Sequence, residues 1–145
     1  MIYADTSALG RAYFADEPDH AALRSLLLGG RETVVTSSLT RVEIASAAHR
    51  ATRAGRIRDG SRILERFDAD CSADGPIVRL RVRSNGLLAV AVDLVAAHAL
   101  RVLDAIHLAV ALTDGRALAN EEPLTFVTRD VEQAVAARAH GLAVA

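Results

Sequence analysis

The chain of 145 residues is 51% hydrophobic and 24% charged, with a formal net charge of −1 at pH 7. This length predicts a single domain, residues 1–145, that buries a core without disulfides or a structural metal. The small net charge excludes a strongly basic module that binds nucleic acid by charge alone, and because all 17 basic residues are arginines, mechanisms that need a lysine amine are excluded too.

Short apolar runs alternate with longer helical patterns along the chain. Strands are predicted at residues 2–4, 33–36, 76–80, 124–128 and 142–144. Helices are predicted at residues 7–15, 19–28, 40–55, 61–70, 85–98, 103–112 and 131–140. In the third of these helices, Thr40 and Glu43 have the spacing of a capping box. Because the strands are brief, apolar and separated by helices, we expect an α/β fold, a three-layer α/β/α sandwich with a central, mostly parallel sheet.

Two of the predicted strands end in an acid and a hydroxyl. Asp5 follows the first strand and precedes Thr6, and Asp130 follows Thr128 at the end of LTFVTRD. Parallel strands deliver their carboxyl ends to the same edge of a sheet, which is where ligands bind in open α/β folds. One such acid is explained as a helix N-cap, but two of them indicate a site.

Two further acids interrupt apolar helical faces. Glu43 lies in LTRVEIASAAHR, and Asp104 lies in LRVLDAIHLAVAL. A buried carboxylate is costly unless it is paired with a cation. The structural alternatives are an ion pair with Arg41 or Arg101, or an N-cap role for Asp104. Taken with the strand-end acids, they favour one anionic pocket.

Four carboxylates without lysine or paired cysteines suit a hard divalent cation, Mg²⁺ or Mn²⁺, which prefers oxygen ligands. Such an ion polarises a phosphate and lowers the pKa of a bound water that then acts as nucleophile. The sequence therefore predicts a phosphodiester substrate.

Four stretches together resemble the PIN-domain ribonucleases, specifically the VapC-type toxins of bacterial toxin–antitoxin pairs. They are DTSAL at Asp5, RVEI at Glu43, LDAIHLA at Asp104 and VTRD at Asp130, in that order across nearly the whole chain. The resemblance implies a PIN-like fold and a metal-dependent endoribonuclease. It also implies a homodimer, and a cognate VapB-type antitoxin whose C-terminal segment lies across the active-site groove.

The resemblance also assigns residue roles. Asp5, Glu43 and Asp104 would be the core metal ligands, with Asp130 as the fourth acid. A metal-activated water would attack phosphorus in line with the leaving 3′-oxygen and give a 5′-phosphate.

Two hydroxyls complete the set of site residues that the resemblance implies. Thr6 and Thr128 would orient waters or phosphate oxygens. RNA shape and backbone, rather than base stacking, would set substrate choice, since only three Phe and two Tyr are present.

Two alternatives stay open. A non-catalytic PIN-fold binding domain would keep the fold without activity, although intact acids at all four positions argue against it. A phosphohydrolase of another α/β family would also place an acid after the first strand. Such enzymes normally need a lysine near the phosphate, and the haloacid-type phosphatases need a second Asp two residues after the first, which DTSAL lacks.

The remaining features have mostly structural interpretations. His107 is interpreted as a satisfied histidine on a half-buried helix face, and Cys71 as packing in a reducing, cytoplasmic compartment. No signal peptide or membrane span is expected. Two arginine groups are candidate RNA contacts or solvated surface: Arg50, Arg53, Arg56 and Arg58, and Arg79, Arg81 and Arg83. Three leucines pack on the sheet or pair two chains: Leu23, Leu26 and Leu27.

Overall fold

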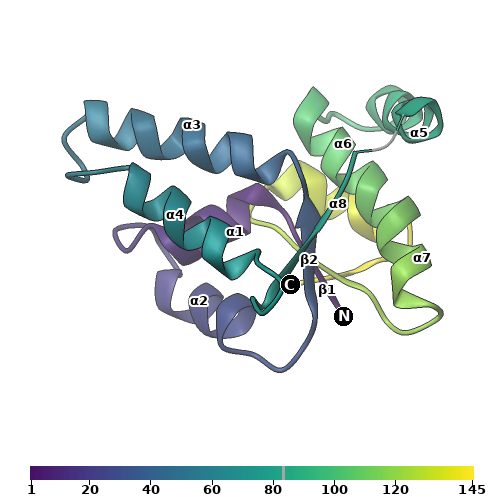
Figure 1. The fold of residues 1–145 in the computed structure, drawn as a ribbon. Helices are drawn as coiled ribbons and strands as arrows, with labels where there is room; N and C mark the ends of the chain where they lie inside the picture. The colour runs from purple at the N-terminus through teal and green to yellow at the C-terminus, as the bar shows by residue number, and fades with distance from the viewer. Residues whose placement is uncertain (83) are drawn as a thin grey trace.

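The computed structural model describes residues 1–82 and 84–145, and its centre is one parallel sheet (Figure 1). The sheet has five strands in the order β3-β2-β1-β4-β5, and every neighbouring pair is parallel. The strands are β1 (Ile2–Ala4), β2 (Val34–Ser37), β3 (Ile77–Leu80), β4 (Thr125–Val127) and β5 (Ala143–Val144). The predicted sheet is confirmed.

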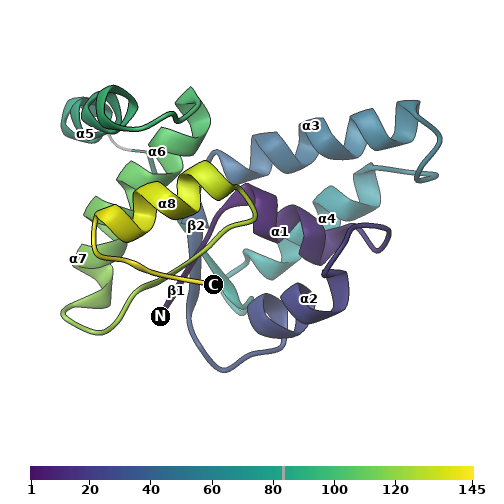
Figure 2. The same ribbon diagram turned by 180° about the vertical axis from the view of Figure 1, so that it is seen from behind.

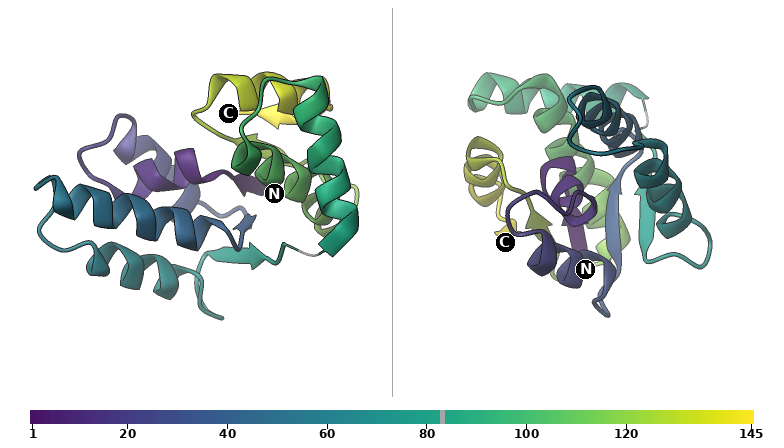
Figure 3. Two further views of the ribbon diagram at one scale, coloured as in Figure 1. Left: turned by 90° about the horizontal axis from the view of Figure 1, so that it is seen from above. Right: turned by 90° about the vertical axis from the view of Figure 1, so that its left-hand side faces the viewer.

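Helices cover both faces of this sheet, which makes the predicted three layers (Figures 1 and 2). One layer holds α1 (Thr6–Tyr13), α2 (His20–Leu28), α3 (Thr40–Arg53) and α4 (Ser61–Asp70). The other holds α5 (Ser84–Ala97), α6 (Val102–Val110), a π-helical turn η1 (Ala111–Gly115), α7 (Arg116–Ala119) and α8 (Val131–Ala139). Within the first layer α3 and α4 run side by side (Figure 3).

The pleat of β1 divides the core in two. Ile2 and Ala4 pack in the cluster with α1 to α4, whereas Tyr3 packs in the cluster with α5 to α8. All three side chains are at most 2% exposed, because alternate residues of a strand point to opposite faces and both faces carry helices. The apolar character of the opening run is thus explained by its central place in the sheet.

Strand order places a crevice between β1 and β4. The chain moves outward from β1 to β2 and β3, then returns to pair β4 with the other side of β1. In open parallel sheets this reversal of direction leaves a gap at the carboxyl ends of the two strands, where ligands bind. Asp5 and Asp130 follow these two strands.

Two sequence predictions about helices are wrong. The helix predicted at residues 103–112 continues through η1 and α7 to Ala119. Gly115 lies within it and serves close packing, since an added Cβ atom would lie 3.3 Å from Leu124. The capping box of Thr40 and Glu43 does not form, since α3 has Leu39 at its N-cap without a side-chain cap bond.

Of the three leucines that either pack within the protein or pair two chains, two belong to the core. Leu23 and Leu27 are each 1% exposed and pack with α1, whereas Leu26 is 38% exposed. No helix in the described part of the chain is both long and apolar enough to cross a bilayer.

We expect Leu23→Ala to lower the free energy of unfolding by about 2–5 kcal/mol, because it leaves a cavity between α2 and the rest of its layer. Leu26→Ala, the same change three residues along α2, should cost less than about 1 kcal/mol. Urea denaturation of both variants measures the difference, and equal losses would contradict the packing described for α2.

Candidate active site

The two strand-end acids both cap helices. The Asp5 carboxylate accepts a hydrogen bond of 2.9 Å from the backbone N–H of Ser7 at the start of α1. The Asp130 carboxylate accepts one of 2.9 Å from the backbone N–H of Gln133 at the start of α8. The structural alternative, a helix N-cap, is therefore present at both acids. Both helices thus direct their N-termini, the positive ends of their dipoles, at this edge of the sheet.

Gln133 is the residue that joins these acids. Its side-chain amide donates to Asp5 Oδ1 at 3.3 Å and to the backbone carbonyl oxygen of Asp104 at 3.1 Å. Its Oε1 accepts a 2.6 Å hydrogen bond from Thr128 Oγ1. Because Gln133 is fully buried, each of these bonds removes a polar group that would otherwise be unsatisfied.

Ser7 extends this hydrogen-bond network to Arg129 and settles which hydroxyl donates in each bond. Ser7 Oγ accepts from the backbone N–H of Arg129 at 2.8 Å and lies 3.1 Å from Thr128 Oγ1. Since the Thr128 hydroxyl proton is used on Gln133, the Ser7 hydroxyl is the donor to Thr128. Donors thus lead from Arg129 through two hydroxyls and the amide to Asp5.

Glu43 is held by a second set of contacts. Its Oε2 accepts from Thr6 Oγ1 at 2.7 Å and from His107 Nε2 at 2.7 Å. The other ring nitrogen of His107 lies 3.1 Å from the Tyr3 hydroxyl and 3.6 Å from Asp5 Oδ1. His107 therefore connects Glu43 on α3 with Asp5 after β1.

Asp104 forms the ion pair that the sequence analysis proposed with Arg101. Arg101 Nε donates to Asp104 Oδ2 at 2.8 Å, and its Nη2 donates to Asp130 Oδ2 at 3.4 Å. The other proposed partner, Arg41, instead forms a bidentate pair with Asp68 away from this cluster. The exposed guanidinium of Arg101 is thus the positive charge between two of the acids.

Burial and charge act in opposite directions on these groups. Burial raises the pKa of Asp104, and the Arg101 hydrogen bond offsets this only in part. Burial also raises the pKa of Glu43, but the hydrogen bonds from His107 and Thr6 outweigh it and leave that pKa below its usual range. The pKa of His107 is raised, since the hydrogen bond to Glu43 and the nearby acids outweigh the effect of its burial.

The donor set fits a hard cation, although the acids do not surround a common point. Carboxylate oxygens from four elements meet at this edge, and they are the ligands that Mg²⁺ and Mn²⁺ prefer. Within residues 1–82 and 84–145, no three Asp, Glu, His or Cys side chains are grouped as ligands of one ion. Arg101, His107 and Gln133 instead provide the contacts that these acids make.

Gln133 was not among the predicted site residues, and for His107 the structural interpretation was preferred to that of a second ligand beside Asp104. His107 is three residues after Asp104, which places both on one face of α6. Gln133 is three residues after Asp130, the spacing of a capping box, so a helix start was visible but the reach of its amide was not. Both side chains are fully buried and in contact with predicted site residues.

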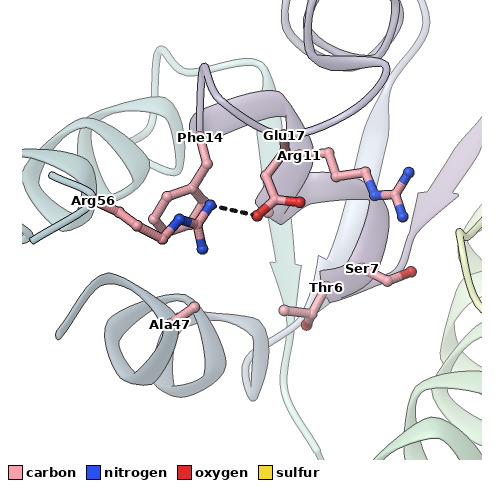
Figure 4. Close-up of a pocket in the computed structure, with 8 residues that line it drawn as sticks. Thr6, Ser7, Arg11, Phe14, Glu17, Ala47 and Arg56 are labelled. Atoms are coloured by element: carbon pink, nitrogen blue, oxygen red, sulfur yellow. Dashed lines mark hydrogen bonds and ion pairs between the residues drawn. The ribbon is translucent and has the colours of Figure 1, made fainter. Parts of the chain in front are cut away.

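A pocket of about 190 Å³ opens beside Thr6 and Ser7 (Figure 4). Arg56 in its wall forms ion pairs of 2.8 Å with Asp16 and 2.7 Å with Glu17. The remaining lining residues are Gly10, Arg11, Phe14 and Ala47.

Arginines from both groups of candidate RNA contacts have partners within the protein. Arg50 donates to Ser46 on the same helix, and Arg79 lies 3.9 Å from Asp68. Arg83 lies outside the described residues.

The family model for the PIN domain matches residues 2–139. A toxin–antitoxin complex from Klebsiella pneumoniae has a similar fold, with a TM-score of 0.61 and 19% sequence identity over 92% of this chain and 89% of that chain. FitAcB from Neisseria gonorrhoeae is similar with a TM-score of 0.56 and 19% identity over 99% of this chain and 96% of that chain. No curated protein matches the chain.

An α/β/α sandwich with acids at the carboxyl edge of its parallel sheet is thus the class that fold and site define. Since the family match spans almost its whole length, the chain belongs to the PIN domain family.

We expect Gln133→Met to lower the free energy of unfolding by about 1–3 kcal/mol, because the buried Thr128 hydroxyl and Asp5 carboxylate each lose a partner while the volume is nearly kept. Glu132→Met, at the exposed neighbouring position in α8, should cost no more than about 1 kcal/mol. Thermal and urea denaturation test this, and a silent Gln133→Met would contradict the linking role of the amide.

Proposed function

We propose that this chain is a metal-dependent endoribonuclease, the VapC-type toxin of a toxin–antitoxin pair, that hydrolyses RNA phosphodiester bonds. The observation that carries the proposal is the joining of Asp5, Glu43, Asp104 and Asp130 through shared contacts at the crevice between β1 and β4. An enclosed apolar pocket would suit a small substrate, whereas this open edge suits a chain that passes across it.

The four acids are the proposed ligands of Mg²⁺ or Mn²⁺. When bound, such an ion supplies Lewis-acid stabilisation of the phosphate and a water of lowered pKa. Neighbouring groups hold the ligands: Thr6 and His107 orient Glu43, and Gln133 orients Asp5.

Two hydroxyls have distinct proposed roles at this edge. The Thr6 hydroxyl faces the Glu43 carboxylate, and that of Thr128 is turned into the protein toward Gln133. We assign Thr6 to orienting waters or phosphate oxygens. Thr128 acts through Gln133, as a positioning residue.

The proposed partners are an RNA substrate, a cognate VapB-type antitoxin and a second copy of the chain, in the cytoplasm. One of the structural neighbours is a toxin–antitoxin complex, which supports the antitoxin. Because two leucines of α2 are buried, we propose the homodimer contact on α5 and α6 instead. Exposed apolar side chains there support it: Leu88 is 47%, Val92 66% and Val102 68% exposed.

We expect Asp104→Asn to lower the rate of RNA cleavage in Mg²⁺ or Mn²⁺ at least about 100-fold, because it removes one carboxylate of the proposed metal site. Asp93→Asn makes the same change at an exposed position of α5 and should retain full activity. Gel analysis of total RNA incubated with each variant, with and without EDTA, measures the effect.

Thermal shift with each ion separates the proposal from a non-catalytic PIN-fold domain. A rise in Tm on adding Mg²⁺ or Mn²⁺ that Asp104→Asn reduces supports the metal site. An unchanged Tm, together with no cleavage of any RNA, would refute the nuclease and favour a binding domain.

A further inference from the structure

We propose that Arg11 and Arg129 form a clamp for an RNA backbone phosphate next to the cleavage site, and that Asp19 occupies this clamp in the free protein. This inference rests on the proposed nuclease function and names residues that hold its substrate. It starts from an electrostatic need, since a cluster of acids repels the polyanion that it is proposed to cut.

Arg129 has an unused donor at the site. Among the residues that the structure describes, its Nε is a buried side-chain nitrogen without a hydrogen-bond partner, and a group of this kind calls for an explanation. Its Nη1 donates to the carbonyl oxygen of Thr128 at 2.9 Å. The guanidinium is therefore anchored at one end, while its buried Nε–H makes no hydrogen bond.

Arg11 lies beside this guanidinium and shares its counter-ion. Asp19 Oδ2 is 3.6 Å from Arg11 Nη1 and 3.5 Å from Arg129 Nε. Both distances are longer than a direct charged hydrogen bond, which is about 2.7–2.9 Å. By contrast, Arg56 meets its two acids at 2.7 and 2.8 Å, so its guanidinium is already engaged.

Asp19 has the properties of an exchangeable counter-ion. Its side chain is 56% exposed, whereas those of Arg11 and Arg129 are 29% and 27% exposed. Asp19 precedes α2 in the left-handed conformation, with φ of 60°, and makes no side-chain cap bond there. A phosphate has three acceptor oxygens and more charge than this one carboxylate, so it can meet both arginines with direct hydrogen bonds.

The clamp lies next to the acids that define the site. The backbone N–H of Arg129 donates to Ser7 Oγ, and the backbone N–H of Ser7 donates to Asp5. Arg11 also lines the pocket that opens beside Thr6 and Ser7 (Figure 4). We therefore assign the clamp to an RNA strand rather than to an acidic protein segment, because the proposed function already brings this polyanion to the same edge.

The test is RNA binding measured by fluorescence anisotropy of two labelled single-stranded oligonucleotides of different sequence, in EDTA so that no cleavage occurs. Arg11→Gln and Arg129→Gln should each weaken binding about three- to tenfold for both sequences, because phosphate contacts carry no sequence information. Each should also reduce the slope of log K against log[NaCl] by about 0.7.

Asp19→Asn should act in the opposite direction. It removes the competing charge with little change of shape, and asparagine tolerates the left-handed conformation at this position. We expect RNA to bind about three- to tenfold more tightly, with no loss of salt dependence. Structural damage alone would weaken binding in all three variants, so tighter binding is the signature of the clamp.

Arg31→Gln is the matched control, since Arg31 is exposed near the amino-terminal edge of β2, away from the acids. If wild-type protein cleaves RNA but Arg11→Gln and Arg129→Gln bind as Arg31→Gln does, the clamp is refuted and the nuclease stands. If wild-type protein binds neither oligonucleotide and cleaves no RNA, both proposals are refuted.

Discussion

Repulsion between carboxylates is the constraint on which the site depends, because the parallel sheet brings Asp5 and Asp130 to one edge and two helices add Glu43 and Asp104. The protein meets this repulsion with different donors for each acid. A guanidinium lies between Asp104 and Asp130, an imidazole binds Glu43, and an amide and a helix start bind Asp5. Those donors fix where the four carboxylates of the candidate site point.

The sequence was sufficient for the sheet and for the position of its acids. Apolar runs bounded by polar residues located each strand boundary to within one residue, and helical connections favoured parallel pairing. Asp5 and Asp130 could be placed at one edge of the sheet because the end of a strand is visible in the local sequence. That their two strands are neighbours follows only from the topology. The Arg101 pair with Asp104 was also visible, since three residues along a helix is one turn.

The rest depends on contacts between distant segments that local patterns do not encode. Gln133 resembles any polar residue in a first helical turn, and only the fold shows that its amide reaches Asp5 across 128 positions. His107 has the sequence context of a core histidine, yet its partner Glu43 lies on the opposite layer. In the sequence alone, Gly115 is typical of a helix end. Only the fold shows that the absence of a Cβ atom there leaves room for Leu124.

The candidate site is also divided between the two layers. The layer of α1 to α4 draws almost all of its core from the first half of the chain, so its contacts close short loops, whereas β4 must travel back to pair with β1. Non-local pairing of this kind is slow to form. Asp5 and Glu43 therefore belong to the layer that is built from nearby segments of the chain, whereas Gln133 and Asp104 come from the other layer. The candidate site is complete only where the two layers meet across β1, so each layer alone carries half of its acids.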